Sequence, residues 1–311
     1  MSALPWHAEH WERLQSRIAR GAMPHAVLLC GPAGLGKRAF LQRFVRGLLC
    51  ERPQQGDACG QCRACLLLDA GTHPDFVRLS FGLRKDGVQR SEIVVDQIRE
   101  LSARLAMASQ FGGWQVVVID PADAMNAAAA NALLKTLEEP SPQTLLLLVA
   151  DAPWRLPQTI RSRCQRIEFQ LPVREQALAW LVAQGVSEPA AALDAAGGNP
   201  GLAQAWAEQG ALARRQTVRK DLAALAAGRG EPMEIARRWL DGEPAQCLWF
   251  AAQAAADEAR ARAAGANGPL ASSLDAEALA DWYAAANRTR DGLRGPLRGD
   301  LLLLELLARW R

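Results

Sequence analysis

The segment that most constrains the fold is GPAGLGKR at Gly31–Arg38, which directly follows the apolar run AVLLC. A glycine-rich turn between a buried strand and a helix resembles the phosphate-binding loop G-x-x-x-x-G-K-[ST]. In that loop backbone amides surround phosphates, the lysine reaches the outer phosphates, and the hydroxyl binds magnesium. Gly31, Gly36 and Lys37 keep the pattern, whereas Arg38 stands at the hydroxyl position. The segment predicts a parallel α/β fold whose phosphate loop is altered.

The remaining pattern supports this fold class over residues 1–170. Short β-rich runs alternate with longer helical patterns, which is typical of βαβ units and a parallel sheet covered on both faces. We expect strands at 26–30, 76–80, 114–120, 144–150 and 166–169. We expect helices at 37–49, at 91–108 with Ser91 as the N-cap, and at 126–140, where Pro140 ends the last one.

After residue 170 the strand signal disappears. The sequence becomes rich in alanine, leucine, arginine and tryptophan, with glycine- and proline-containing breaks, which indicates helices joined by short connections. We therefore expect an α/β domain at 1–170, a small helical domain at 171–208 and a helical C-terminal domain at 209–311.

Charge and hydropathy narrow the function classes. Lys and Arg number 36 against 33 Asp and Glu, so a net charge of +3 gives little support for nucleic-acid binding by the chain alone. We see no signal segment, and the longest apolar runs, LLLLVA and LLLLELL, fall well short of the roughly 20 residues that span a bilayer. We expect a cytoplasmic protein without membrane contact, in which the seven cysteines bind metal or are buried thiols.

Acidic residues near the expected third strand bear on ATP hydrolysis. The run VVVID ends in Asp120, which is the position of a metal-binding acid in phosphate-loop enzymes. Pro121 follows where a water-activating carboxylate would stand. Asp123 comes two residues later, where we expect its side chain to point in a different direction. Two groups that ATP hydrolysis requires are therefore replaced: the loop hydroxyl by Arg38 and the water-activating carboxylate by Pro121. Phosphate could still bind at Lys37, because that needs only amides and charge.

A second group of residues predicts a metal site. Cys59, Cys62 and Cys65 have the spacing C-x2-C-x2-C, with Cys50 upstream and turn-forming residues between. Four thiolates of this kind suit a tetrahedral ion, with zinc as the default and an iron–sulfur cluster as the alternative. His73 is a less favoured replacement ligand. The remaining candidates for metal, Cys30 and Cys247, lie in apolar runs and are interpreted as core residues.

Two arginines precede the last expected strand in TIRSRCQRIEF. Arg161 and Arg163 are two apart, so they point different ways on a helix end or turn. An arginine supplied by a neighbouring subunit can complete that subunit's ATP site. The spacing alone favours the plainer alternative, a surface ion pair with an acid such as Glu168.

Taken in order, GPAGLGKR, the cysteine module, NALLKTLEEP (131–140) and the SRC of Ser162–Cys164 resemble the clamp-loader family of bacterial AAA+ proteins, over roughly residues 20–205. In that family the motor subunits keep the loop hydroxyl and an Asp-Glu pair after the strand. This chain has Arg38 and Pro121 instead, and GGNPG at 197–201 lacks the motors' nucleotide-sensing arginine. The departures match the family's stator type, which does not hydrolyse ATP.

The resemblance implies an AAA+ domain with a zinc module, a helical lid and an all-helical collar. It implies that Arg163 acts on a neighbour's ATP as an arginine finger and that Cys50, Cys59, Cys62 and Cys65 bind zinc. No functional site for ATP and magnesium is expected in the chain itself. The implied partners are gamma/tau motor subunits and delta in a pentameric ring, which loads the sliding clamp of DNA polymerase III onto primed DNA.

Three alternatives stay open at this point. The chain could instead be an ATP-hydrolysing motor subunit with a variant loop, against which Arg38 and Pro121 argue. It could also be a free-standing zinc protein that recognises DNA, which the near-neutral charge disfavours. Finally, the apolar stripe of DLLLLELLARW near the C-terminus could be buried against ring partners or in the core of its own domain.

Overall fold

A computed structural model describes residues 4–83, 87–293 and 298–310. The chain divides into two compact units. The first comprises Met1–Trp180 and Asn199–Leu202, and the second comprises Leu181–Gly198 and Ala203–Arg311. None of the described helices is long and apolar enough to cross a membrane.

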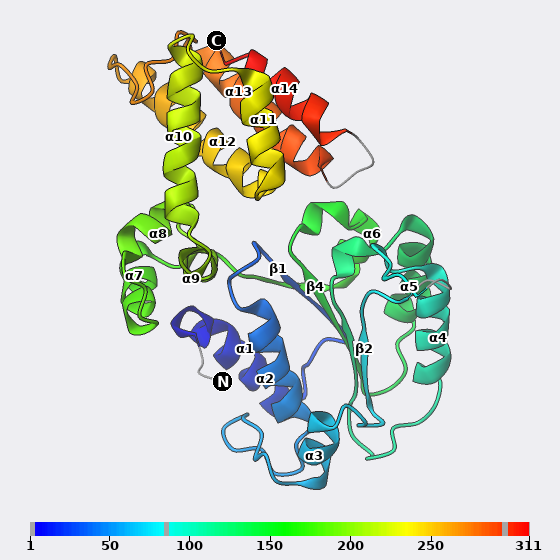
Figure 1. Cartoon of the computed structure of the whole chain (residues 1–311). Coiled ribbons are helices and arrows are strands. Elements are labelled where there is room, and N and C mark those ends of the chain that lie inside the picture. The colour runs from blue at the N-terminus through cyan, green and yellow to red at the C-terminus, as the bar shows by residue number, and fades with distance from the viewer. Residues whose placement is uncertain (1–3, 84–86, 294–297, 311) are drawn as a thin grey trace. The chain divides into compact units, whose positions relative to one another are not determined.

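The first unit is built on one parallel sheet of five strands in the order β2-β3-β4-β1-β5 (Figure 1). Every neighbouring pair is parallel, and the register sets Ala26 of β1 opposite Leu146 of β4. The inner strands are buried along their whole length and are apolar except for Gln115 and Thr144, because helices cover both faces. The strands are β1 (Ala26–Cys30), β2 (Phe76–Leu79), β3 (Gln115–Ile119), β4 (Thr144–Ala150) and β5 (Gln165–Glu168).

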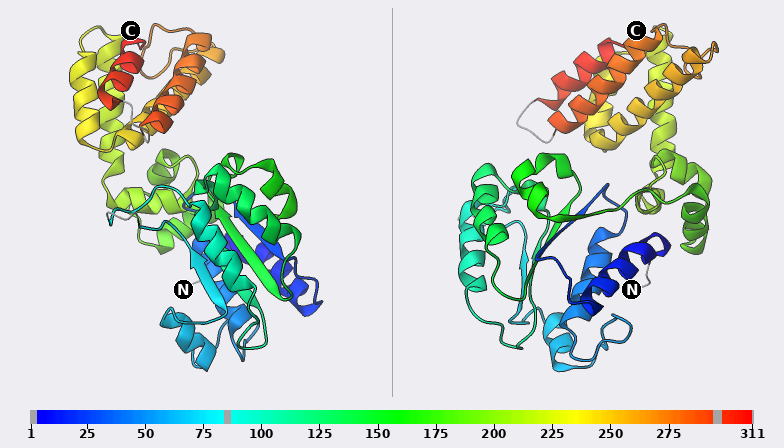
Figure 2. Two further views of the ribbon diagram at one scale, coloured as in Figure 1. Left: turned by 90° about the vertical axis from the view of Figure 1, so that its right-hand side faces the viewer. Right: turned by 180° about the vertical axis from the view of Figure 1, so that it is seen from behind.

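Helices lie on both faces of this sheet, as Figures 1 and 2 show. One face packs against α1 and α2, and the other against α4, α5 and α6. Alternate residues of each strand therefore belong to separate apolar clusters, such as Leu28 on one face and Leu29 on the other. The α-helices are α1 (Ala8–Ala19), α2 (Lys37–Leu49), α3 (Arg63–Asp69), α4 (Val95–Leu105), α5 (Ala127–Glu138) and α6 (Gln158–Arg163); the 3-10 turns are η1 (Pro5–His7), η2 (Ala122–Ala124) and η3 (Pro153–Arg155).

The expected five strands and the helix after the phosphate loop are confirmed, but the predicted start of the helix at 91–108 was wrong. The helix begins at Val95 with Val94 as N-cap, and Ser91 lies outside it. The reason is a tertiary contact: Ile93 pairs with Met125 in a short parallel bridge, and its amide donates to Ala124 O over 2.9 Å. This pairing holds the backbone extended where the apolar spacing alone predicts helix.

All regular elements among the described residues of the second unit are helices, and the boundary between the units passes through α7 and α9. Its core includes the C-terminal stripe: Leu303, Leu306, Leu307 and Trp310 are buried among the helices of this unit. The stripe thus packs within its own unit. The helices after the sheet are α7 (Arg174–Ala183), α8 (Pro189–Ala195), α9 (Pro200–Glu208), α10 (Ala211–Ala226), α11 (Pro232–Asp241), α12 (Pro244–Ala263), α13 (Ala276–Gly292) and α14 (Gly299–Ala308).

Candidate functional site

The altered loop lies between the end of β1 and the start of α2, at the carboxyl edge of the sheet. Gly36 is the N-cap of α2 and has φ of 78°, a left-handed conformation that favours glycine. A Cβ at this position would lie 2.3 Å from Cδ1 of Leu4, because the N-terminal segment packs directly on the loop. Glycine at Gly36 is therefore required both by the turn and by the close approach of η1.

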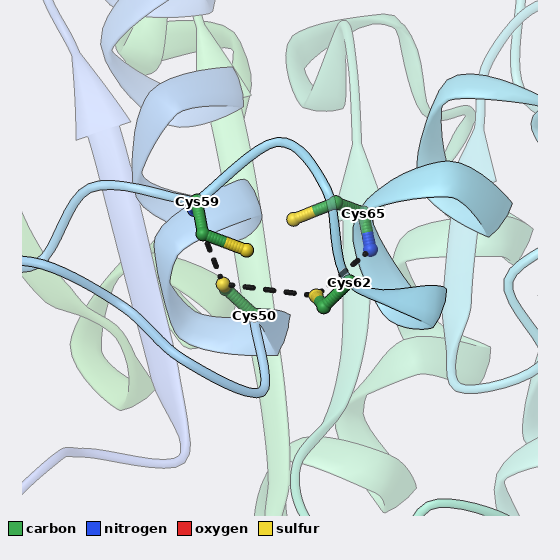
Figure 3. Close-up of side chains that lie close together, drawn as sticks. All are labelled: Cys50, Cys59, Cys62 and Cys65. Atoms are coloured by element: carbon green, nitrogen blue, oxygen red, sulfur yellow. Dashed lines mark hydrogen bonds between the residues drawn. The ribbon is translucent and has the colours of Figure 1, made fainter.

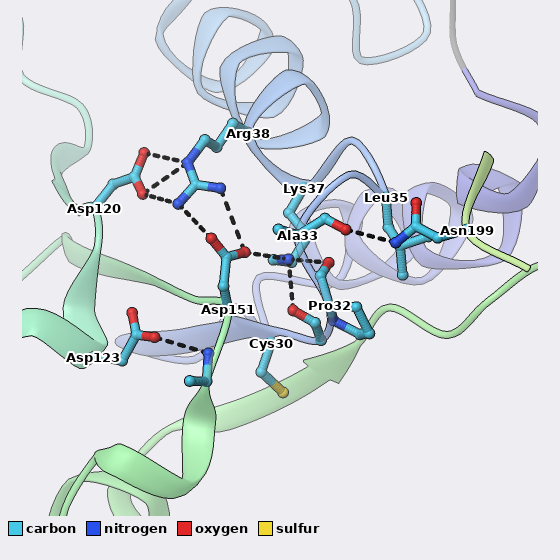
Figure 4. Close-up of polar contacts among 12 residues, drawn as sticks. Cys30, Pro32, Ala33, Leu35, Lys37, Arg38, Asp120, Asp123, Asp151 and Asn199 are labelled. Atoms are coloured by element: carbon cyan, nitrogen blue, oxygen red, sulfur yellow. Dashed lines mark hydrogen bonds and ion pairs between the residues drawn. The ribbon is translucent and has the colours of Figure 1, made fainter. Parts of the chain in front are cut away.

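Lys37 is directed back onto its own loop (Figure 4). Its Nζ donates to Gly31 O and Pro32 O, each at 2.6 Å, and lies 2.6 Å from Oδ1 of Asp151. The side chain is buried, and burial lowers the lysine pKa although Asp151 acts in the opposite direction. An ammonium group has three protons to donate, so these three acceptors satisfy it fully. The lysine that would reach outer phosphates is engaged by protein groups.

Arg38 bridges two carboxylates that follow neighbouring strands (Figure 4). Its Nε lies 3.0 Å from both carboxylate oxygens of Asp120, and one terminal nitrogen lies 2.9 Å from Oδ2 of Asp151. A third cation, Arg78, approaches Asp120 at 3.1 Å. Asp120 is 4% exposed, so its charge needs such partners. The guanidinium thus contacts Asp120, the acid at the position that would hold a metal ion in a phosphate-loop enzyme.

Asp151 was not singled out from the sequence, although it directly follows the run at 144–150. Burial acts to raise its pKa, but hydrogen bonds from Arg38 and Lys37 outweigh burial and hold the pKa below the ordinary value. Asp123 has a structural contact, since its Oδ2 accepts from the amide of Ala152 at 2.8 Å. The sequence did offer a signal for Asp151, because an acidic residue directly follows the predicted strand at 144–150.

Other segments of the first unit hold the loop from outside. Trp6 Nε1 donates to Leu35 O at 3.1 Å, and His7 Nε2 lies 2.7 Å from the same oxygen. Burial lowers the His7 pKa, and a carbonyl can only accept, so the neutral ring carries its proton on Nε2. Asn199 Nδ2 donates to Ala33 O at 2.7 Å, as Figure 4 also shows. The loop carbonyls are therefore bonded by two other segments of the chain, η1 and Asn199.

Arg163 ends α6 and is partly exposed. One terminal nitrogen lies 2.7 Å from Oε1 of Glu138, and the other donates to Thr159 O at 3.1 Å. The side chains of Arg163 and Glu138 are 38% and 49% exposed, so the pair is a surface ion pair. Its partner comes from the end of α5 and is not Glu168, the acid that the sequence suggested. Arg161 differs, because its Nε is buried without a hydrogen-bond partner in the described part of the chain.

The four cysteines of the module converge, as Figure 3 shows, with their sulfur atoms all within 4.8 Å of one another. Cys50 Sγ and Cys62 Sγ are 3.8 Å apart. A tetrahedral ion with metal–sulfur bonds of about 2.3 Å places its sulfurs about 3.8 Å apart. An iron–sulfur cluster would separate them further, because several iron atoms lie between the thiolates. The four cysteines can hold a single ion such as zinc.

The surroundings of the sulfurs also fit thiolates. Backbone amides of Arg52 and Cys59 point to Cys50 Sγ at 3.4 and 3.3 Å, and the amide of Cys65 points to Cys62 Sγ at 3.5 Å. Hydrogen bonds from Gln61 and Cys62 amides lower the Cys59 pKa to about 6, whereas burial raises the pKa of Cys65 to about 12. His73 lies outside this group, and Cys30 and Cys247 are buried as expected.

The fold and this site together define a class of protein. It is a parallel α/β protein with a glycine-rich loop between a strand and a helix, in which the basic residues of the loop contact acidic residues at the ends of neighbouring strands. The family follows from direct comparison. The family model described as "DNA polymerase III, delta subunit" matches residues 6–172, so the chain belongs to that family.

Individual relatives agree with this assignment. The chain is 44% identical to DNA polymerase III subunit delta' of Pseudomonas aeruginosa, over 69% of this chain and 64% of the relative. It is 38% identical to the subunit delta' of Escherichia coli, over 70% of this chain and 65% of the relative. The alignments thus span less than two thirds of these relatives.

A solved structure of a DNA polymerase III gamma subunit-related protein from Thermotoga maritima is 16% identical, with a TM-score of 0.46. The match covers 97% of this chain and 99% of that protein.

Proposed function

We propose that this chain is a non-hydrolysing stator subunit of the delta' type in a DNA polymerase III clamp loader. The observation that carries the proposal is the bridge from Arg38 to Asp120 and Asp151, together with Lys37 bound to its own loop. A magnesium ion would have to displace Arg38 from the two carboxylates, and the outer phosphates of ATP would have to draw Lys37 away from Asp151 and the loop carbonyls. Pro121 follows Asp120 where a water-activating carboxylate would be needed.

The positive role that we propose belongs to Arg163. Its guanidinium is partly exposed and its partner Glu138 is itself at the surface, so solvent screens the pair and its net strength is small. A neighbouring ATP phosphate carries more charge than one carboxylate and can take the arginine over. In the proposed ring, the neighbour is a gamma/tau motor subunit, and delta completes the assembly around primed DNA and the sliding clamp.

The rest of the chain has supporting roles in this proposal. Cys50, Cys59, Cys62 and Cys65 bind a structural zinc ion, which stabilises a polar module with little core of its own. Residues 171–208 act as the lid domain and residues 209–311 as the collar through which the ring assembles.

An ATP hydrolysis assay on the isolated chain tests the proposal that this subunit does not hydrolyse ATP. We expect no ATP hydrolysis above background, because the metal hydroxyl and the water-activating carboxylate are both replaced. Turnover that Lys37→Ala abolishes would instead identify a motor subunit with a variant loop.

The arginine finger is tested in a reconstituted loader with DNA-stimulated ATP hydrolysis as the readout. Arg163→Ala should leave assembly intact and cut hydrolysis at the neighbouring site, where an arginine finger can be worth on the order of a thousandfold. Other motor sites keep their own fingers, so the bulk rate falls less. Arg163→Lys should also fail, because lysine lacks the planar fork.

A surface arginine without this role provides the matched control. Arg166→Ala removes an exposed side chain whose ion pair with Glu168 spans 4.0 Å, so it should leave hydrolysis unchanged. Equal loss from both alanine variants would show that hydrolysis responds to general surface charge and that the assignment of Arg163 is wrong.

A further inference from the structure

Four residues from the helical part of the sequence belong to the first unit. Asn199–Leu202 are grouped with the parallel sheet, whereas the residues on either side of them, Leu181–Gly198 and Ala203–Arg311, form the second unit. This stretch, which we call the 199–202 segment, includes the start of α9 at Pro200. Its contacts within the first unit are with the altered phosphate loop.

The side chain of Asn199 joins the loop to the first turn of α9. Its Nδ2 donates to Ala33 O at 2.7 Å (Figure 4), and its Oδ1 accepts from the amide of Leu202 at 3.1 Å. The Leu202 amide lies in the first turn of the helix, where no backbone acceptor is available to it. Asn199 is buried, so either bond would be costly to leave unmade. One side chain thus satisfies both the loop and the helix.

A close contact between two glycines reinforces this bond. A Cβ at Gly201 would lie 1.9 Å from Gly34 O, and a Cβ at Gly34 would lie 2.8 Å from Oδ1 of Asn199. Cβ atoms do not approach oxygen atoms this closely, so the two backbones can pack together only because both residues are glycine. Gly201 is the second residue of α9 and does not have positive φ. Helix propensity favours other residues there, so the contact with the loop accounts for the glycine.

Protein side chains donate to the other carbonyls of the loop as well. Lys37 donates to two of them, Asn199 to a third and Trp6 to a fourth. These bonds hold the loop through its carbonyls and need no ligand at its amides. The four carbonyls are those of Gly31, Pro32, Ala33 and Leu35.

We propose that the 199–202 segment is a permanent brace, which holds the altered loop in one conformation without any bound nucleotide. Asn199 supplies the polar contact, and Gly201 against Gly34 supplies the close backbone contact. Both contacts come from the chain itself, so the loop does not depend on phosphate or magnesium for its order. The start of α9 therefore stays attached to the loop whatever ligand is present.

The brace is a property separate from the stator role. A chain that hydrolysed ATP could carry the same contacts, and a chain without hydrolysis could have a mobile loop. Loop order and ATP turnover are therefore measured independently, and either result can stand when the other fails.

The experiment measures NMR relaxation of backbone amides in the full chain, with the order parameters of Gly34 and Leu35 as the readout. Rigid backbone has an order parameter of about 0.85, and flexible backbone has one below about 0.6. We expect the rigid value for both amides without nucleotide, and no increase when ATP and magnesium are added at millimolar concentration.

Two variants break the brace in different ways. Asn199→Asp keeps an oxygen that can accept from the Leu202 amide, but it places a second oxygen against Ala33 O in place of the donor. Gly201→Ala improves the helix propensity of α9 but introduces the excluded Cβ. Each variant should lower the order parameters of Gly34 and Leu35 below about 0.6.

Matched controls make the same substitutions away from the loop. Asn126→Asp keeps the oxygen that accepts from the amide of Ala129 at the start of α5. Gly292→Ala places a Cβ in ordinary contact with Leu302, at 3.5 Å. Both controls should leave the order parameters of the loop unchanged.

Two results would overturn the proposal. The first is a mobile loop in the wild type, with order parameters below about 0.6 that rise when ATP is added, because a ligand would then order the loop. The second is an unchanged loop in both Asn199→Asp and Gly201→Ala. Circular dichroism verifies that each variant keeps its fold, and the wild-type measurement decides the proposal even if a variant does not fold.

Discussion

Arg38→Thr restores the hydroxyl of a phosphate loop and removes the cation that joins the ends of β3 and β4. Arg38 approaches Asp120 within 2.8 Å and Asp151 within 2.9 Å. A hydrogen bond to a charged group contributes about 1.5–3 kcal/mol. Arg38 is 43% exposed, and solvent screening reduces that value.

Part of the interaction also survives the substitution. Asp120 keeps Arg78, and Asp151 keeps Lys37. We therefore expect the free energy of unfolding of the first unit to fall by about 1–2 kcal/mol. Because the chain has two units, the measurement is hydrogen exchange of β3 (Gln115–Ile119) in increasing urea, which reports the first unit separately.

Lowering the pH gives a second test of the stability that the contact between Arg38 and Asp151 contributes. The pKa of Asp151 is held below its ordinary value of 3.8, so the stability it contributes is present above that value and is lost as pH falls through the folded-state pKa. The stability difference between the wild type and Arg38→Thr should be full at neutral pH and shrink below 3.8.

The control and the refuting results are distinct. Arg166→Thr, at an exposed pair, should change the free energy of unfolding by less than about 0.5 kcal/mol. A loss in Arg38→Thr no larger than this control would refute the bridging argument. The variant should also remain without ATPase activity, since the hydroxyl alone supplies neither a water-activating carboxylate nor a free lysine. Turnover in Arg38→Thr would contradict the proposed dead site.

Three further outcomes are expected. Metal analysis should find about one zinc ion per chain, and Cys62→Ser should lose the ion and expose residues 50–65 to protease, whereas Cys247→Ser should keep it. Gly47→Ala should lower the free energy of unfolding by about 1–3 kcal/mol and weaken zinc retention. A Cβ at Gly47 would lie 1.8 Å from Gly56 O, whereas Gly113→Ala meets no atom within 4 Å and should be close to neutral. Glu138→Gln should free Arg163 and leave DNA-stimulated hydrolysis in the reconstituted loader equal or higher; a fall as large as that of Arg163→Ala would show that the ion pair itself is needed.

Local sequence determined the order of strands and helices in the first unit. Apolar runs of five to seven residues, such as Thr144–Ala150, are buried strands because both faces of the sheet are covered. The cysteine spacing predicted the converging sulfurs for a similar reason: Cys59, Cys62 and Cys65 lie within one short turn-rich segment. Such features depend on neighbours along the chain, which the sequence displays directly.

Only the tertiary structure decided how the site residues are used. Arg38 meets Asp120 and Asp151 across 82 and 113 positions of sequence. Arg163 at the end of α6 pairs with Glu138 at the end of α5. Each of these contacts depends on which strands and helices become neighbours in the fold. Spacing along the chain carries no information about such contacts, because the residues that meet are far apart in the sequence.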